Sequence, residues 1–173
     1  MISIIAAVSD NGVVGDKNTL PWTRRVPRDM KHFVEQTKHG IVIMGRNTFE
    51  SMGSVPLKNR VNIVVSSKLK AEENTITVVT NLNDALSHAL KLSLSQDPQP
   101  KVFVIGGTNI WKEAMQSEFV ERALITRIRE TFEGDTSFPE EDLKKGYSLF
   151  YKTEWKEVDP TLLSSTFEVW KRK

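Results

Sequence analysis

Val102–Gly107 reads VFVIGG, and this stretch decides the fold. Four consecutive apolar residues without polar alternation are typical of a strand that is covered on both faces. The glycines Gly106 and Gly107 then allow a tight turn into a helix, which we expect to continue to about Met115. A buried strand that passes directly into a helix is the repeating unit of a sheet covered by helices.

The same alternation extends through the first two-thirds of the chain. A helix stop is expected near Gly40, and a helix cap at Asn81 or Asn83. Apolar strands are predicted at 2–8, 41–44, 61–65, 76–79 and 123–128, and helices at 28–38, at 46–52 and from the Asn81 or Asn83 cap to the loop at 95–100.

Period-two alternation at 148–153 and 166–171 indicates antiparallel edge strands at the C-terminal end, and a charged loop is expected at 69–75. The sequence therefore predicts a single α/β domain over residues 1–173. Its central sheet is mixed but mostly parallel, with about eight strands, an antiparallel C-terminal end and about four flanking helices.

Composition excludes several classes of protein. The 173 residues are 39% hydrophobic and 27% charged, which is ordinary for a globular protein and argues against disorder. The absence of cysteine excludes thiol chemistry and disulfides and fits a reducing compartment. No stretch approaches the ~20 apolar residues of a membrane span, and Met1 leads directly into a core strand rather than a signal peptide. We expect a cytoplasmic protein.

The charge distribution suits an anionic small ligand. Residues 1–60 carry nine Lys/Arg against five Asp/Glu, whereas residues 101–142 carry five against nine. Solvated surface charge explains the same pattern equally simply. A nucleic-acid binder is a further alternative, but the basic first third has no recognised motif and no interleaved aromatic residues.

The segment 20–33, LPWTRRVPRDMKHF, changes from loop to helix at Pro27, whose missing N–H costs least at a helix start. Asp29 then falls in the first turn, just before the first core-facing residue. The i, i+3, i+4, i+7 spacing predicts one buried helix face, made by Met30, Phe33, Val34 and Thr37. An acid there can simply complement the helix dipole. It can also stand at the rim of an apolar cleft.

Glycines, cations and hydroxyls gather where predicted strands end. Because ligands of α/β sheets bind at the carboxyl ends of strands, a dinucleotide is expected there. The pattern is neither G-x-G-x-x-G nor a P-loop. Cations and no acid at these ends favour NADP over NAD, although tight turns and surface cations are the simpler interpretation. The stretches are Gly45-Arg46-Asn47-Thr48, Ser66-Ser67-Lys68 and Gly106-Gly107-Thr108-Asn109.

Other polar residues carry weaker signals. Arg60 follows a turn and precedes a buried strand, a position suited to bidentate capture of a carboxylate, although a solvated Arg is commoner. His32, His39 and His88 lack metal-ligand spacing and are interpreted as surface or structural residues. No G-x-S-x-G elbow supports hydrolase chemistry. No metal site is expected.

Together these stretches resemble the dihydrofolate reductase family nearly end to end. The resemblance implies NADPH-dependent reduction of 7,8-dihydrofolate to tetrahydrofolate, which supports one-carbon metabolism and thymidylate and purine synthesis. It further implies a monomer that binds dihydrofolate and antifolate inhibitors, but no nucleic acid and no membrane. The matching blocks are ISIIAAVSDNGVVG, LPW, Pro27-Arg28-Asp29, IVIMGRNTFESMG, NIVVSS, VFVIGGTNIW and EGDTSFP.

The resemblance also implies a role for individual residues. Asp29 matches the acid that binds the pterin and promotes protonation at N5, with Thr126 in support and Trp22 beside it. Arg60 matches the residue that holds the substrate's α-carboxylate. The pocket walls are implied to be Ile5, Ala7, Met30, Phe33, Met52 and Ile105. The cofactor contacts are implied to be Ala7, Val14, Gly15, Leu20, Gly45, Arg46, Asn47, Thr48, Ser66, Ser67, Lys68, Gly106, Gly107, Thr108, Asn109, Ile110 and Trp111. Gly106 and Gly107 match a pair joined by a cis peptide.

The loop Gly15–Trp22 suits a lid over the nicotinamide, since it has glycine and proline near its ends and no apolar stripe. Three positions depart from the family pattern: the loops 22–27 and 53–56 look longer, and Trp111 stands where tyrosine or phenylalanine is usual. The alternatives are a related pterin or pyrimidine reductase of the same fold, and an NADPH-binding module without turnover.

Overall fold

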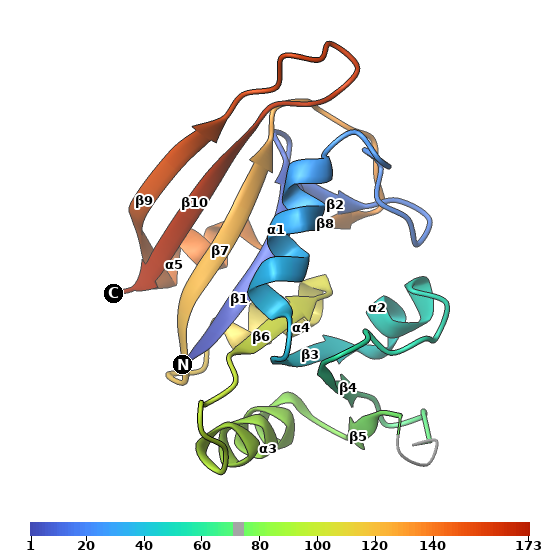
Figure 1. Ribbon diagram of the computed structural model, residues 1–173, viewed down its shortest axis with the longest axis vertical. Helices are drawn as coiled ribbons and strands as arrows, with labels where there is room; N and C mark the ends of the chain where they lie inside the picture. The colour runs from blue at the N-terminus through green and yellow to red at the C-terminus, as the bar shows by residue number, and fades with distance from the viewer. Residues whose placement is uncertain (71–74) are drawn as a thin grey trace.

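The computed structural model describes residues 1–70 and 75–173, and an eight-stranded sheet dominates it (Figure 1). The strand order is β5-β4-β3-β6-β1-β7-β10-β9. The first six strands in this order run parallel, whereas β10 is antiparallel to both of its neighbours. The bounds are β1 (Ile2–Ser9), β3 (Ile41–Gly45), β4 (Val61–Val65), β5 (Thr77–Val79), β6 (Val102–Gly106), β7 (Val120–Ile128), β9 (Tyr147–Trp155) and β10 (Ser165–Arg172).

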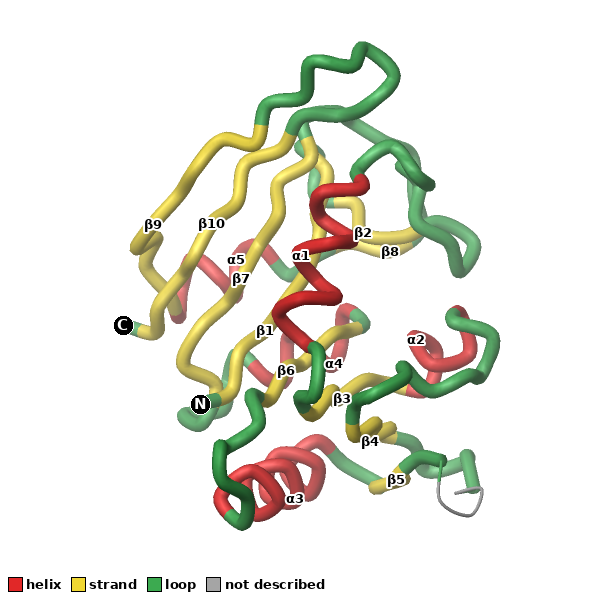
Figure 2. The backbone as a smooth tube through the Cα atoms, viewed as in Figure 1, coloured by secondary structure: helices red, strands yellow, loops and turns green. Residues whose placement is uncertain are grey.

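Helices cover the sheet as Figure 2 shows. Successive side chains of a buried strand point to opposite faces of the sheet and pack into a different hydrophobic core on each face. Ile41 and Ile43 of β3 pack with helices α3 (Leu82–Leu94) and α4 (Thr108–Ala114). Val42 and Met44 point the other way and pack with Phe49 of α2 (Arg46–Ser51). Helix α1 (Pro27–Thr37) lies in front of β1 in Figure 1. The predicted mostly parallel mixed sheet with an antiparallel C-terminal end is confirmed.

Within the described residues there are five helices rather than about four, because α5 (Glu140–Gly146) was not predicted. Leu143 is the one residue of α5 that is buried, so the segment has no apolar stripe to reveal it. A two-stranded sheet of β2 (Val13–Gly15) and β8 (Thr136–Ser137) is also additional. Strand β7 begins at Val120, earlier than expected, because Glu121 and Arg122 interrupt its apolar run.

Helix α1 departs most from the sequence-based expectation. It ends at Thr37, and His39 (φ 59°), not Gly40, takes the left-handed conformation beyond it. Thr37 is the one fully buried residue of α1, whereas Met30 is 50% exposed and Val34 42% exposed. The prediction that Met30 and Val34 face the core is therefore wrong. The expected loop at 69–75 includes residues 71–74, which lie outside the described residues.

Candidate active site

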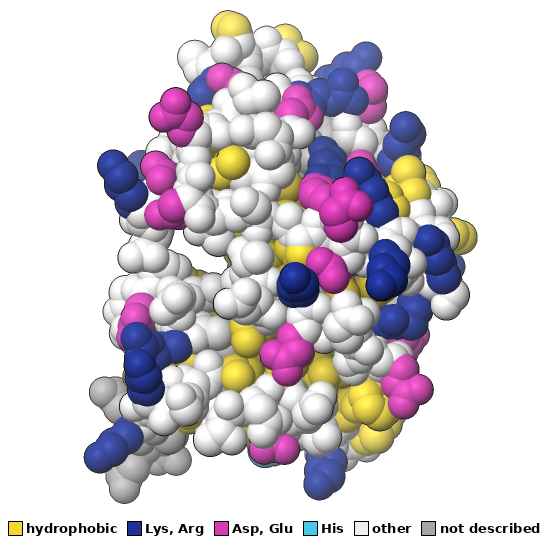
Figure 3. Space-filling view, turned by 180° about the vertical axis from the view of Figure 1, so that it is seen from behind, with side chains coloured by type: hydrophobic (Ala, Val, Ile, Leu, Met, Phe, Trp, Pro, Cys, Tyr) yellow, Lys and Arg dark blue, Asp and Glu magenta, His cyan; other side chains and the backbone are white. Residues whose placement is uncertain are grey.

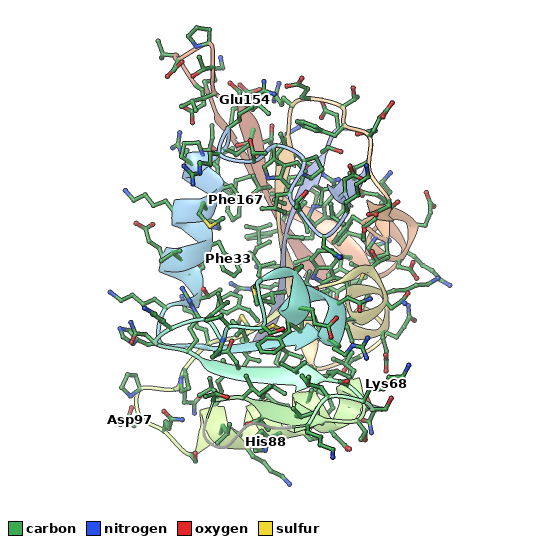
Figure 4. The ribbon with its side chains drawn as sticks, turned by 90° about the vertical axis from the view of Figure 1, so that its right-hand side faces the viewer. Phe33, Lys68, His88, Asp97, Glu154 and Phe167 are labelled. Carbon is green, nitrogen blue, oxygen red and sulfur yellow. The ribbon has the colours of Figure 1, made fainter. Side chains whose placement is uncertain are left out.

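Three strand ends meet at one edge of the sheet. Gly45 at the end of β3 is in register with Val65 of β4, and Met44 is in register with Gly106 of β6. The glycine and cation stretches predicted from the sequence are therefore neighbours in space. Figure 4 shows Lys68 beyond the end of β4. The structure thus brings together the residues that the sequence distributes over three separate segments.

The two glycine turns leave backbone N–H groups uncovered. Gly45 and Gly107 are the N-terminal caps of α2 and α4, and neither helix start has a capping side chain. A Cβ atom added to Gly45 would lie 3.0 Å from Cγ1 of Ile110. Gly106 and Gly107 are joined by a cis peptide, as the resemblance implied. The turns form a surface that an anionic group can approach closely.

Trp111 lies beneath this surface. Its indole is 6% exposed and donates a hydrogen bond from Nε1 to the carbonyl oxygen of Val104 at 3.2 Å. Gly106 has φ of +126°, and a Cβ atom there would lie 2.9 Å from Cζ2 of Trp111. The Trp111 ring also packs against Phe138, with centroids 5.4 Å apart. The structure therefore places Trp111 as a support under the turn.

The polar side chains around the turns differ in whether they already have a hydrogen-bond or ion-pair partner and in how exposed they are. Arg46 is paired with Glu50 at 3.1 Å, and the Thr108 hydroxyl donates to the carbonyl oxygen of Ser137 at 2.7 Å. Ser66 Oγ accepts from the backbone N–H groups of Lys68 and Leu69. Thr48 is half-buried, whereas the side chains that reach solvent are those of Asn47, Ser67, Lys68 and Asn109.

Asp29 occupies the first turn of α1 against the sheet. Burial raises the pKa of its carboxyl group, and a hydrogen bond with the Thr126 side chain partly opposes this. Thr126 is 2% exposed and is in register with Ala7 of β1. A carboxyl group with a raised pKa beside a sheet is a candidate for proton chemistry.

The apolar side chains predicted to line the pocket differ in position and exposure. Phe33 of α1 lies toward the sheet in Figure 4. Met52 and Ile105 are partly buried and pack into one cluster on the same face of the sheet as α2. Ile5 of β1 is more deeply buried, with 6% of its surface exposed. Met30 is exposed and Phe33 is half-buried, so neither is a core residue and both remain available to contact a ligand.

Arg60 lies beside Phe33, one of the apolar residues predicted for the pocket. Its guanidinium carbon lies 6.0 Å from the centroid of the Phe33 ring, and Nη1 donates to the Lys58 carbonyl oxygen at 3.2 Å. Its Nε atom is buried and has no hydrogen-bond partner among the described residues. Burial lowers the pKa of Arg60. A guanidinium with an unused, inward N–H group is suited to an anionic partner.

The predicted lid is attached to the second sheet. Gly15 of β2 is in register with Thr136 of β8, and the Lys17 backbone N–H donates to Asp135 Oδ2 at 3.1 Å. Leu20 is 41% exposed, whereas Val14 is 9% exposed and belongs to the main core. The backbone anchor at Asp135 was not predicted, although the EGDTSFP block contains it.

Trp22 lies at the far end of this loop and is 2% exposed. Its ring meets Phe132 edge-on, with centroids 5.7 Å apart, in a cluster that also includes half-buried Ala7. Sequence reasoning missed Phe132, which no periodic pattern marks. Trp22 therefore packs beside the predicted pocket residue Ala7.

Two grooves of about 450 and 480 Å³ lie elsewhere and share Asp10, Arg127 and Glu168. Arg127 is already paired with Glu140 and Glu168. Figure 3 shows cationic and acidic side chains interspersed on the rear face. Because the Arg127 guanidinium shared by both grooves already has two carboxylate partners, the region around Asp29 is the better candidate site.

A buried acid and a glycine-lined turn surface at the carboxyl edge of a mostly parallel sheet define an α/β enzyme of the dinucleotide-dependent class. The family model described as dihydrofolate reductase matches residues 1–172. The protein belongs to the dihydrofolate reductase family.

Relatives and a solved structure agree with this membership. The chain is 40% identical over 142 residues to dihydrofolate reductase of Bacillus subtilis, covering 82% of this chain and 77% of that one. It is 37% identical over 154 residues to the Sus scrofa enzyme, covering 83% and 82%. The structure of Enterococcus faecalis dihydrofolate reductase, complexed with NADP(H) and RAB-propyl, aligns with a TM-score of 0.86 and 31% identity, covering 100% of this chain and 96% of that one.

Proposed function

We propose that this protein reduces 7,8-dihydrofolate to 5,6,7,8-tetrahydrofolate with NADPH, and that Asp29 promotes the protonation at N5 that accompanies hydride addition at C6. The observation that carries the proposal is the buried Asp29 carboxyl group, supported by Thr126, on the sheet face that also holds the Phe33, Met52 and Ile105 side chains. When bound, NADPH supplies the hydride.

Asp29 is suited to orient the pterin and to influence its proton. In a poorly solvated site a carboxylate attracts a positively charged ring more strongly than it does in water. The same desolvation raises the pKa of Asp29. The site therefore favours a state in which a proton is shared between Asp29 and the bound pterin over a bare carboxylate. Thr126 donates to the carboxylate and thereby fixes its orientation. The proton delivered to N5 ultimately comes from solvent.

The substrate tail is proposed to end at Arg60. Its buried Nε N–H has no partner among the described residues, and a carboxylate is the acceptor that a guanidinium binds best. Phe33 beneath the guanidinium and the partly buried Met52 offer apolar contacts to the ring between pterin and tail. A pterin that lacks a carboxylated tail would leave Arg60 unpaired.

The uncapped turns fit the cofactor. Neither Gly45 nor Gly107 has a side chain that would cover the first N–H groups of α2 and α4. Exposed Ser67 and Lys68, with Arg46, supply the hydroxyl and cations that a 2′-phosphate requires. The remaining proposed contacts come from Gly15 and Leu20 of the lid loop and from Ala7, Val14, Asn47, Thr48, Ser66, Asn109 and Ile110. Trp111 acts beneath the turn.

The lid loop is proposed to exclude water from the reacting rings. Its attachment to Asp135 fixes one side, whereas Leu20 reaches solvent and is free to contact a bound ligand. Water exclusion strengthens the interaction of Asp29 with the pterin.

We further propose that residues 1–173 act as one domain, as a cytoplasmic monomer that also binds antifolate inhibitors and does not bind nucleic acid. No helix among the described residues is long and apolar enough to cross a membrane. The near balance of charge, +2 over the chain, supports the absence of a nucleic-acid partner. Sedimentation of the full chain tests the monomer.

The direct test follows absorbance at 340 nm after 7,8-dihydrofolate is added to protein and NADPH. We expect one NADPH oxidised for each tetrahydrofolate formed, and little oxidation with NADH. Dihydrobiopterin, which has no carboxylated tail, should react poorly. Equal rates with both pterins would favour the related pterin reductase, and binding of NADPH without oxidation would favour the non-catalytic module.

A further inference from the structure

His32 lies in an aromatic slot that the proposed chemistry does not use. Its imidazole meets the Phe167 ring edge-on, with centroids 4.6 Å apart, and the Trp155 ring at 5.2 Å. Phe167 and Trp155 are themselves stacked, 5.1 Å apart and within 3° of parallel. The Nε2 atom of His32 is buried and has no hydrogen-bond partner among the described residues. The slot therefore holds the Nε2 side of a titratable ring by packing against aromatic rings.

This slot is the attachment of the middle of α1 to the sheet. The one fully buried side chain of α1 is Thr37, in its last turn, whereas Met30 and Val34 are exposed. His32 comes one turn after Asp29, so the position of its ring helps to determine where Asp29 lies. Figure 4 shows Phe167 on the side of α1 that faces the sheet.

The slot is also connected to Thr126. Phe167 of β10 is directly opposite Thr126 of β7 in the antiparallel ladder. Side chains of directly opposite residues lie on the same face and in contact distance. The ring that holds His32 is therefore the neighbour of the hydroxyl that holds Asp29.

Burial, rather than the charges around the slot, disfavours an imidazolium at His32. On α1, Arg28 places its guanidinium carbon 5.0 Å from the Trp155 ring centroid, so this ring already carries a cation. Glu35, also on α1, favours a proton on His32, but burial dominates and lowers the pKa of His32. The charged residues of β9 and β10 nearest in sequence, Lys152, Glu154 and Glu168, line the groove on the opposite face.

We infer that His32 is a positioning residue: as a neutral ring in the Trp155–Phe167 slot it fixes α1, and so holds Asp29 against Thr126, and protonation of the ring releases α1 and slows hydride transfer. The inference rests on the proposed dihydrofolate reduction. A charged ring whose Nε2 atom is buried without a hydrogen-bond partner is costly to keep in the slot, so the protonated state favours a displaced helix.

The first experiment measures protonation without turnover. Histidine labelled at Cε1 is titrated by NMR in the full chain, and the His32 signal is assigned by its loss in His32→Phe. We expect His32 to titrate below the ordinary range of a histidine. Titration of His32 within or above that range would overturn the inference, whatever the protein's activity.

The second experiment measures single-turnover hydride transfer between pH 5 and 8 in wild type, His32→Phe and the control His88→Gln. Phenylalanine keeps an aromatic edge in the slot but cannot titrate. Because one proton is involved, we expect the His32 contribution to lower the wild-type rate by up to about tenfold per pH unit below its midpoint. His32→Phe should lack this contribution, match wild type near pH 8 and retain any decline due to Asp29. Superimposable profiles for wild type and His32→Phe would contradict the inference.

Phe167→Leu provides an independent variant, because it opens the slot and keeps the imidazole. It should move the His32 midpoint up toward the ordinary range of a histidine and slow hydride transfer even at pH 8, when the ring is neutral. An unchanged midpoint and rate in this variant would also contradict the inference. If wild type fails to oxidise NADPH with dihydrofolate, the proposed function fails, while the NMR titration still tests the slot.

Discussion

Replacement of Gly106 by alanine tests how the turn surface is built. The residue has φ of +126°, a conformation in which a non-glycine residue costs about 1–3 kcal/mol. The new Cβ would also lie 2.9 Å from Cζ2 of Trp111, and overpacking of this kind costs about 1–3 kcal/mol. We therefore expect Gly106→Ala to lower the free energy of unfolding by about 2–6 kcal/mol in total.

A double-mutant cycle separates the two costs. Trp111→Phe removes the indole atoms that a Cβ at position 106 would touch, although it also loses the hydrogen bond to Val104. The interaction free energy between Gly106→Ala and Trp111→Phe should be about 1–3 kcal/mol, because only the overpacking cost depends on the indole. Gly53→Ala is the matched control for backbone strain, because Gly53 has φ of +78° and nothing within 4 Å of an added Cβ.

Urea unfolding of wild type, the two single variants, the double variant and Gly53→Ala supplies the free energies of unfolding. Activity assays should show in parallel that Gly106→Ala raises the KM for NADPH, since the turn is part of the proposed cofactor surface. A loss of stability no larger than that of Gly53→Ala, or no coupling with Trp111→Phe, would refute the reasoning about the Trp111 support.

Further predictions concern Asp29, Arg60 and the contact between Asp135 and the lid. Asp29→Asn should lower hydride transfer at neutral pH by about 10²–10⁴-fold in stopped-flow measurements and leave NADPH binding unchanged; unchanged hydride transfer would contradict the role of Asp29. Because burial raises the pKa of Asp29, its ionisation destabilises the fold as pH rises above the unfolded-state value, so Asp29→Asn should also raise Tm at pH 7 but not at pH 3. Arg60→Gln should raise the KM for dihydrofolate by about 10–150-fold, from a lost charged hydrogen bond of about 1.5–3 kcal/mol, whereas exposed Lys58→Gln should not; similar KM values for the two variants would exclude the tail contact. Asp135→Ala should release the lid backbone at Lys17 and speed NADPH dissociation in a competition trap, and an unchanged dissociation rate would show that the contact does not hold the lid.

The sheet could be predicted because its strands are apolar runs buried on both faces. Val102–Gly106 and Ile41–Gly45 show no alternation and adopt neighbouring parallel positions. The strands Val13–Gly15 and Thr136–Ser137 are too short for any period to be seen. Helix Glu140–Gly146 escaped prediction because Leu143 alone is buried in it.

The site could be predicted only in part. Met30 follows core periodicity yet is half exposed, since an apolar helical face can border a ligand cleft as well as a core. The unpaired Nε of Arg60 and the aromatic slot around His32 depend on contacts between distant segments, which no local pattern encodes. The attachment of Lys17 to Asp135 likewise joins residues 118 positions apart.

The central claim is that a desolvated carboxyl group on α1 controls the proton that accompanies hydride transfer. The most direct measurement is the single-turnover rate of the wild-type protein with dihydrofolate and either NADPH or its C4-deuterated form, across pH 5 to 9. We predict a slower rate with the deuterated cofactor and, toward high pH, a decline in the rate that Asp29→Asn does not share. A rate that is independent of pH in wild type, or a decline that persists unchanged in Asp29→Asn, would contradict the claim.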